Sequence, residues 1–205
     1  MQPSEHVVPV NRVLVSVSDK SDLLPFMDFF ANRGVDIWST GGTATMLRDG
    51  KIQVTDVADV TRFPECFDGR LKTLHPLVHG GLLYRRDNRD DVARARELGI
   101  RPIDLLVGNL YPFEKTVAKP GTTWDTAVEN IDIGGPAMIR AAAKNHDYVA
   151  VVTSPEQYKE IIAQIVMNGG TTLAFRRKLM HAAYNMCAHY DMAIAAYIRS
   201  QNGKI

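Results

Sequence analysis

The first sixty residues alternate between short apolar runs and segments with helical periodicity. The apolar runs are rich in β-branched residues and cover residues 12–17, 35–39 and 52–57. The segments between them, 21–32 and 43–50, place apolar residues three and four positions apart, as on one face of a helix. Parallel strands need crossover connections of this kind, so the order favours a parallel sheet with helices on its faces. The chain is therefore predicted to be an α/β protein.

The remaining residues extend this pattern into a single domain. Residues 103–110 and 148–153 are predicted strands, which completes a mostly parallel five-stranded sheet flanked by helices. Residues 79–85 fit a helix or a strand, and 59–76 fit a long functional loop. Predicted helices cover 89–98, 123–130, 136–145, 155–167 with Ser154 as cap, and 171–200 as one long or two abutting helices. We place the domain at 12–200, after a flexible leader at 1–11 and before a tail at 201–205.

Composition and charge argue against several classes of protein. The 205 residues carry 24 Lys and Arg against 23 Asp and Glu, a formal net charge of +1. No global field would attract nucleic acid or an anionic membrane, so neither is an expected partner. No apolar run approaches the roughly 20 residues that span a bilayer. The two cysteines, Cys66 and Cys187, lie far apart and favour a reduced, cytoplasmic protein.

Polar residues follow three of the predicted strands. In an open parallel sheet, ligands bind beyond the carboxyl ends of the strands. The residues at those ends are Ser16, Ser18 and Lys20; Thr40, Gly41, Gly42 and Thr43; and Asn109 and Tyr111. The glycine pair lets backbone N–H groups approach an anion at the start of a helix, although turn formation alone also explains such a pair. We expect these residues to share one anion-binding pocket.

The loop at 69–76, GRLKTLHP, brings two cations close together. Arg70 and Lys72 share a face if the chain is extended, and Thr73 adds a hydroxyl. Such a group can hold a phosphate, or it can be a solvated basic loop. His75 and His79 have a spacing that can ligate zinc on a helix, but Pro76 disfavours a helix through His75 and no zincin glutamate follows, so no metal is predicted.

A second set of candidate functional residues lies at the two ends of a predicted helix that starts at Gly134. Its first backbone N–H groups, at Ile133, Gly134 and Gly135, offer a ready oxyanion hole. Asp132 precedes the helix and Lys144 lies twelve residues later. In a regular helix these two charges are about 15–18 Å apart along the axis, near opposite ends.

Six ordered motifs in the chain closely resemble a known enzyme family. They are SVSDK at 16–20, TGGTA at 40–44, GRLKTLHP at 69–76, NLYPF at 109–113, IDIGG at 131–135 and RAAAKNH at 140–146. Together they resemble the inosine monophosphate (IMP) cyclohydrolase domain found at the N-terminus of bifunctional purine-biosynthesis enzymes. The resemblance implies a methylglyoxal-synthase-like three-layer α/β sandwich. It also implies closure of the purine ring of a formylated imidazole carboxamide ribotide, with loss of water and without cofactor or metal.

The resemblance also implies roles for individual residues. Residues matching substrate or phosphate positions are Ser16, Ser18, Lys20, Thr40, Gly41, Gly42, Thr43, Arg70, Thr73, Asn109, Leu110, Ile133 and Gly134, with Asn109 on the carboxamide or positioning Tyr111. Lys72 would face the formyl oxygen, and Tyr111, Asp132 and Lys144 match acid–base positions. Thr40 stands where some relatives carry Ser, which keeps the hydroxyl. A C-terminal formyltransferase domain in a longer chain and a homodimer are further implied partners.

Two other functions remain open at this stage. Methylglyoxal synthase, a lyase, shares the fold and the phosphate site but needs neither NLYPF nor RAAAKNH. A regulatory nucleotide-binding module would need the phosphate grip but not Tyr111, Asp132 and Lys144. Turnover of the formylated ribotide would separate the cyclohydrolase from both.

Overall fold

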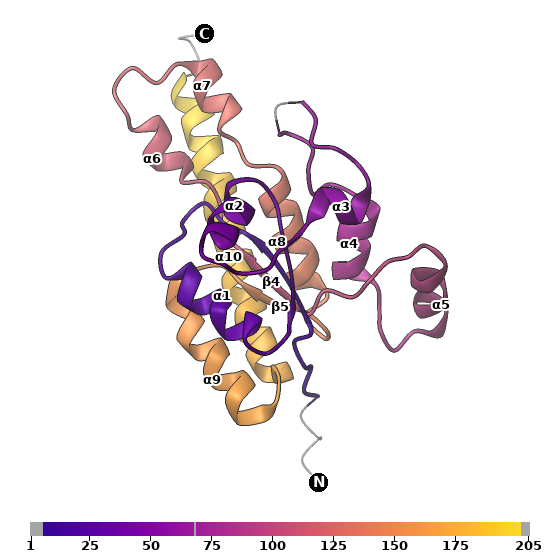
Figure 1. Cartoon of the computed structure of the whole chain (residues 1–205). Coiled ribbons are helices and arrows are strands. Elements are labelled where there is room, and N and C mark those ends of the chain that lie inside the picture. The colour runs from indigo at the N-terminus through magenta and orange to yellow at the C-terminus, as the bar shows by residue number, and fades with distance from the viewer. Residues whose placement is uncertain (1–5, 68, 202–205) are drawn as a thin grey trace.

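A five-stranded parallel sheet forms the centre of the molecule, whose computed structural model describes residues 6–67 and 69–201 (Figure 1). Its strands are β1 (Arg12–Ser16), β2 (Asp36–Ser39), β3 (Thr55–Asp56), β4 (Leu105–Gly108) and β5 (Ala150–Val152). The order is β3-β2-β1-β4-β5, and each neighbouring pair is parallel. The chain builds outward from β1 to β3, then continues on the other side of β1. The order therefore reverses between β1 and β4, the place where open parallel sheets bind ligands.

Helices cover both faces of the sheet, as predicted. On one face lie α1 (Leu23–Ala31) and α9 (Tyr158–Asn168), joined by the stacked rings of Phe26 and Tyr158 at 3.9 Å (Figure 1). On the other, α8 (Gly134–Lys144) and α10 (Leu173–Gln201) pack on each other and on β4 and β5. All four residues of β4 are buried, since both faces of the sheet are covered.

Shorter helices complete the domain. A 3₁₀ turn at Pro155–Gln157 precedes α9, and the helix α4, which spans Pro76–Leu83, packs against α8. The bounds are α2 (Gly41–Asp49), α3 (Val57–Thr61), α4 (Pro76–Leu83), α5 (Arg89–Glu97), α6 (Phe113–Val117) and α7 (Trp124–Glu129). Within the described ranges 6–67 and 69–201, none of these helices combines the length and the apolar character that crossing a membrane requires.

Two elements start or end away from their predicted positions because a side chain caps a helix there. The predicted strand at 52–57 shortens to β3, since the Asp56 carboxylate accepts the Ala58 N–H at 3.1 Å and begins α3. The start of α4 is at Pro76, where the missing proline N–H costs nothing. His75 becomes its N-cap, with Nδ1 accepting the Leu77 N–H at 3.1 Å.

The structure differs from the sequence-based expectations at three further places. The short helix α6 was not predicted. The segment predicted as one or two helices at 171–200 is the single helix α10, which contains no Gly or Pro to interrupt it. Residues 6–11, expected to belong to a flexible leader, instead pack on the body: Val8 is buried and exchanges two backbone hydrogen bonds with Thr171, both 2.9 Å long. Residues 1–5 of that leader and 202–205 of the predicted tail lie outside the described residues.

Candidate active site

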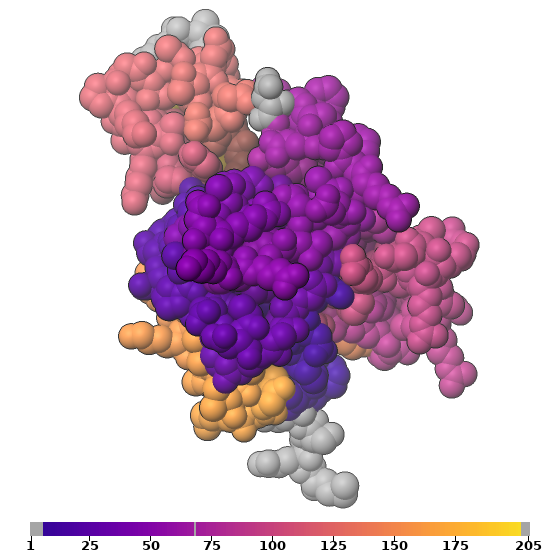
Figure 2. All heavy atoms as spheres, viewed as in Figure 1, coloured from indigo at the N-terminus to yellow at the C-terminus, as the bar shows by residue number. Residues whose placement is uncertain are grey.

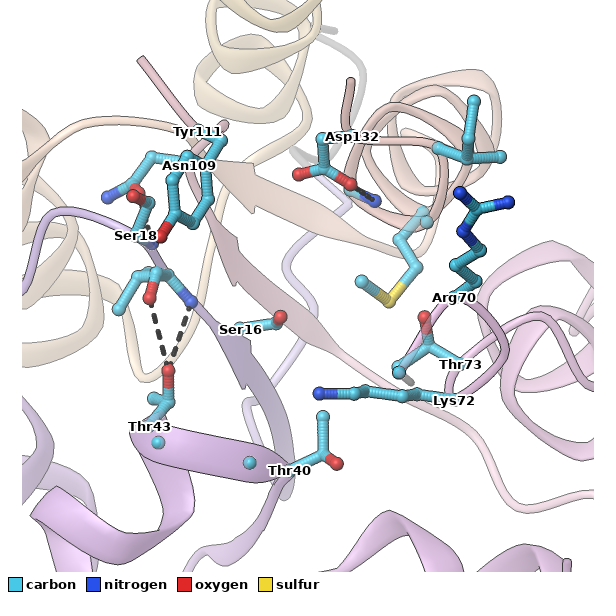
Figure 3. A pocket seen from close by; sticks show the side chains of 18 of the residues that line it. Ser16, Ser18, Thr40, Thr43, Arg70, Lys72, Thr73, Asn109, Tyr111 and Asp132 are labelled. Carbon is cyan, nitrogen blue, oxygen red and sulfur yellow. Dashed lines mark hydrogen bonds between the residues drawn. The ribbon is translucent and has the colours of Figure 1, made fainter. Parts of the chain in front are cut away.

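A cavity of about 760 Å³ opens beyond the carboxyl ends of β1, β2 and β4, at the point where the strand order reverses. In the space-filling view, the part of the chain that carries α6 and α7 stands beside the loop before α4, with a hollow between them (Figure 2). All but two of the predicted site residues line this cavity, namely Ser16, Ser18, Lys20, Thr40, Gly41, Gly42, Thr43, Arg70, Lys72, Thr73, Asn109, Tyr111, Asp132, Ile133 and Gly134. Residues from five separate stretches of sequence thus meet in one place (Figure 3).

The turn after β1 is held by Asn109, which follows β4. The Asn109 Oδ1 accepts the backbone N–H groups of Ser18 at 2.7 Å and Asp19 at 2.9 Å. Its Nδ2 donates to the Asp19 carbonyl at 2.9 Å. The Asn109 amide, expected to meet the substrate or Tyr111, is therefore engaged with this turn, and it orients Ser18 and Lys20 at the cavity.

The start of α2 forms the floor of the cavity. Thr40 is the N-cap in extended conformation and makes no capping bond through its side chain, so its hydroxyl stays at the cavity wall. The first N–H groups of a helix have no intrahelical acceptor and carry a partial positive charge. The Thr43 hydroxyl is used differently, because it donates to the Val17 carbonyl at 3.1 Å (Figure 3).

Lys72 lies across two glycines with positive φ. Its Nζ is 3.3 Å from where a Cβ on Gly41 would stand, and its Cε is 2.9 Å from the corresponding point on Gly69. The Lys72 Nζ pairs with Glu65 Oε1 at 2.9 Å. A side chain at either glycine would therefore crowd this lysine. Thr73, which is buried, lies against Gly134 at the start of α8.

Arg70 lies on the opposite rim and carries its own carboxylate partner. Its guanidinium forms an ion pair with Glu129 at the end of α7. The hydrogen bond from Arg70 holds the pKa of the Glu129 carboxyl below its usual value. Arg70 and Lys72 thus both line the cavity, as predicted, but each neutralises a different acidic residue that the sequence pattern did not single out.

Asp132 is fixed at both its side chain and its backbone. Its Oδ1 accepts the Gly135 N–H at 2.8 Å, and its own N–H donates to the Tyr190 hydroxyl oxygen at 2.7 Å. Burial raises the pKa of the Asp132 carboxyl, although hydrogen bonds from the N–H groups of Gly135 and Tyr111 oppose that shift. The predicted oxyanion hole needs a correction here, since the Gly135 N–H is already engaged and leaves Ile133 and Gly134 as its donors.

Two predicted residues do not line the cavity. Leu110 packs behind it, with Cδ2 2.8 Å from the point where a Cβ on Gly135 would stand. Lys144 is the last residue of the regular helix α8 and is exposed, at the end away from Asp132. In this arrangement it makes no contact with the cavity, so its acid–base role stays a prediction from the family resemblance.

Several cavity residues were missed by the sequence analysis. Leu74, Val128, Glu129 and Asn130 also line the cavity, and Met138 of α8 forms part of its wall. They form no recognisable sequence pattern, because a single apolar or acidic residue is ordinary at the surface until its neighbours in space are known. Within 6–67 and 69–201, no group of three or more His, Cys, Asp and Glu side chains is placed to hold a metal ion.

The chain matches two protein-family models and is similar in sequence to known proteins. Residues 22–137 match the model of the MGS-like domain, and residues 142–205 match that of the AICARFT/IMPCHase bienzyme. The chain is 54% identical over 199 residues to the bifunctional purine biosynthesis protein PurH of Roseobacter denitrificans and 49% identical over 193 residues to PurH of Bacillus mycoides. The two alignments include 97% and 94% of this chain, respectively. The chain spans only 38% of the length of either relative.

A solved structure shows the same architecture. The crystal structure of ForH superimposes with a TM-score of 0.82 at 32% sequence identity, over 90% of this chain and 94% of ForH. Two family models that together cover most of the chain, and PurH relatives at about half identity, therefore agree with the fold. The chain belongs to the MGS-like domain family and corresponds to the N-terminal part of the bifunctional purine biosynthesis protein PurH.

Proposed function

We propose that this chain is an IMP cyclohydrolase. The substrate would be 5-formamido-1-(5-phosphoribosyl)imidazole-4-carboxamide and the products inosine monophosphate and water. The observation that carries the proposal is the convergence of Lys72, Tyr111 and Asp132 with an anion-binding floor in one cavity of about 760 Å³. A phosphate site alone would fit many ligands, whereas acid–base groups beside it fit a reaction.

The ribose 5′-phosphate is proposed to lie at the start of α2. There it meets the first N–H groups of a helix, the hydroxyls of Ser18 and Thr40, and Lys20. A helix N-terminus with hydroxyls and a cation beside it is a favourable environment for a dianion. Arg70 and Thr73, on the loop before α4, would contact the phosphate from the opposite wall of the cavity.

Ring closure is proposed to occur between Lys72 and Asp132. The carboxamide nitrogen attacks the formyl carbon and passes one proton to the formyl oxygen, which gives a carbinolamine. The C–O bond of the carbinolamine then breaks and its hydroxyl leaves as water, with the second proton coming from the former formamide nitrogen as the C=N bond of the ring forms. Lys72 and the N–H groups of Ile133 and Gly134 would stabilise the charge on that oxygen. A carboxyl with a raised pKa, such as Asp132, exchanges protons more readily near neutral pH, and the Tyr111 hydroxyl is a second proton carrier in the cavity.

The direct test is turnover of the formylated ribotide, followed by the ultraviolet absorbance change of ring closure. Wild-type chain should convert it, and Lys72→Met should lower turnover by about a hundredfold or more, the size expected for one oxyanion donor. Lys115→Met, which removes an exposed lysine of α6, is the matched control and should keep wild-type turnover. Absence of turnover by folded wild-type chain would reject the cyclohydrolase.

Two additional ligands separate the other functions. Methylglyoxal formation from dihydroxyacetone phosphate would identify a lyase of the same fold. Tight binding of IMP without turnover of any ribotide would identify a regulatory nucleotide-binding module.

We further propose the wider context of the chain. In a longer protein it would be followed by a formyltransferase domain, which would supply the formylated ribotide, and the protein would act as a cytoplasmic homodimer. The bifunctional name of the PurH relatives supports the first point, and the free state of Cys66 and Cys187 is consistent with a reducing compartment. Light scattering on the purified protein tests the dimer.

A further inference from the structure

Tyr190, in the middle of α10, contacts the active site from a part of the sequence that none of the motifs covers. Its hydroxyl oxygen accepts the backbone N–H of Asp132 at 2.7 Å, although 58 residues separate the two. The side chain is buried, with 8% of its surface exposed. This is a specific polar contact between a core helix and the residue proposed to move a proton.

The hydrogen bond completes the anchoring of the turn at 131–135. The Asp132 carboxylate already caps the start of α8 through the Gly135 N–H. Its backbone N–H precedes the helix and has no partner within the turn, and Tyr190 supplies one. With both groups fixed, the carboxylate and the neighbouring N–H groups of Ile133 and Gly134 are held in one orientation toward the cavity.

The ring of Tyr190 is itself held by the other catalytic segment. It packs edge-on against Phe113, the first residue of α6, with ring centroids 6.3 Å apart. Phe113 lies two residues after Tyr111 in the same stretch of chain. A single side chain of α10 thus contacts the segment that carries Asp132 and the segment that carries Tyr111.

We propose that Tyr190 is a positioning residue for the ring closure, acting through the backbone of Asp132. The proposal rests on the proposed cyclohydrolase function. Tyr190 lies outside the cavity lining, so it does not contact substrate. Loss of its hydroxyl should reduce the rate of the chemical step, which depends on alignment within less than about 1 Å, more than it reduces ribotide binding, which is governed by the start of α2.

The test compares Tyr190→Phe with Tyr197→Phe. Tyr197 lies two helical turns further along α10, also packs edge-on against Phe113, at 5.7 Å, and stacks on Trp124. Among the described residues its hydroxyl makes no hydrogen bond, so each variant keeps its ring, and only Tyr190→Phe removes a hydrogen bond, the one to the Asp132 N–H. Tyr190→Phe should lower kcat about fivefold to tenfold, the effect of one lost hydrogen bond, and leave the calorimetric Kd for IMP within about twofold.

Amide hydrogen exchange measures the hydrogen bond between the Asp132 N–H and Tyr190 independently of catalysis. Exchange of the Asp132 N–H should be at least about fivefold faster in Tyr190→Phe and unchanged in Tyr197→Phe. Wild-type kcat in Tyr190→Phe, or an equal loss in both variants, would overturn the positioning role while leaving the cyclohydrolase intact. If wild-type chain closes no ring at all, the proposed function fails first, and the role of Tyr190 in that reaction fails with it.

Discussion

Arg70 and Glu129 form an ion pair that joins the loop before α4 to the end of α7, at the rim of the cavity. The two residues are 59 positions apart in sequence. A carboxylate thus occupies part of the guanidinium that we propose to bind the substrate phosphate. The two anions compete for the same donors, so the charge balance of the rim should set ribotide affinity.

Removing the competing carboxylate should strengthen ligand binding. Glu129→Gln should tighten binding of IMP up to about fivefold at low salt, since an exposed ion pair contributes at most about 1 kcal/mol. The gain should shrink as salt is added. Titration calorimetry measures it, with Glu114→Gln on α6 as a control that removes an equal charge. Equal effects of the two substitutions would show that only net charge matters.

Removing the cation should have the opposite effect. Arg70→Ala should weaken IMP binding about tenfold, through loss of charge-assisted hydrogen bonds to phosphate, and should lower kcat little. The control is Arg89→Ala, at the start of α5 and outside the cavity. Unchanged affinity of Arg70→Ala would remove Arg70 from the phosphate grip.

The burial of Asp132 predicts a pH-dependent stability difference. Burial raises the pKa of the Asp132 carboxyl in the folded chain, so the protonated carboxyl is more compatible with folding than the carboxylate. Its contribution to stability is fully present below the unfolded pKa of about 4 and is lost as the pH rises through the folded pKa. Asp132→Asn keeps an acceptor for the Gly135 N–H and avoids ionisation. The variant should therefore gain stability relative to wild type between about pH 3 and pH 7, while losing most turnover. Urea unfolding at several pH values measures this; a constant difference would contradict it, and Asp125→Asn on α7 is the control.

The close approach of Lys72 to Gly41 can be separated from backbone strain. Gly41 and Gly34 both have positive φ, 56° and 70°, but of the two only Gly41 has Lys72 within 4 Å of the point where a Cβ would stand. Ala at either site should cost about 1–2 kcal/mol of stability, because an L-residue is strained there. Only Gly41→Ala should also displace Lys72 and reduce turnover, by about tenfold or more. Equal turnover in the two variants would exclude this role of Gly41.

A buried guanidinium should govern the stability of the fold. Arg176 is fully buried, and it donates to the carbonyls of His6, His146 and Asp147 and to Thr171. Burial lowers its pKa to about 10. Arg176→Met leaves these carbonyls unpaired and should cost about 3–5 kcal/mol, whereas exposed Arg177→Met should cost under about 0.5 kcal/mol. Chemical denaturation compares them, and a similar cost for both would show that the carbonyls find other donors.

The sequence predicted most of the fold because its signals are local. A buried strand appears in the sequence as a run of apolar residues, and a helix as apolar residues spaced three or four positions apart. Four of the five strands therefore lie close to their predicted bounds. Capping decided the exceptions. Whether Asp56 continues a strand or begins α3 depends on one side-chain hydrogen bond, and the same holds for His75 at α4.

By itself the sequence determined the fold class and the cavity residues that follow strands, because the carboxyl ends of parallel strands meet at one edge of the sheet. The motif resemblance supplied other cavity residues, such as Arg70 and Gly134. Only the tertiary structure decided their partners. It paired Arg70 with Glu129 and Lys72 with Glu65, and brought Tyr190 to Asp132. Two of these contacts join residues almost sixty positions apart, and the third depends on how the loop before α4 folds back. No local sequence pattern encodes distances that packing alone sets.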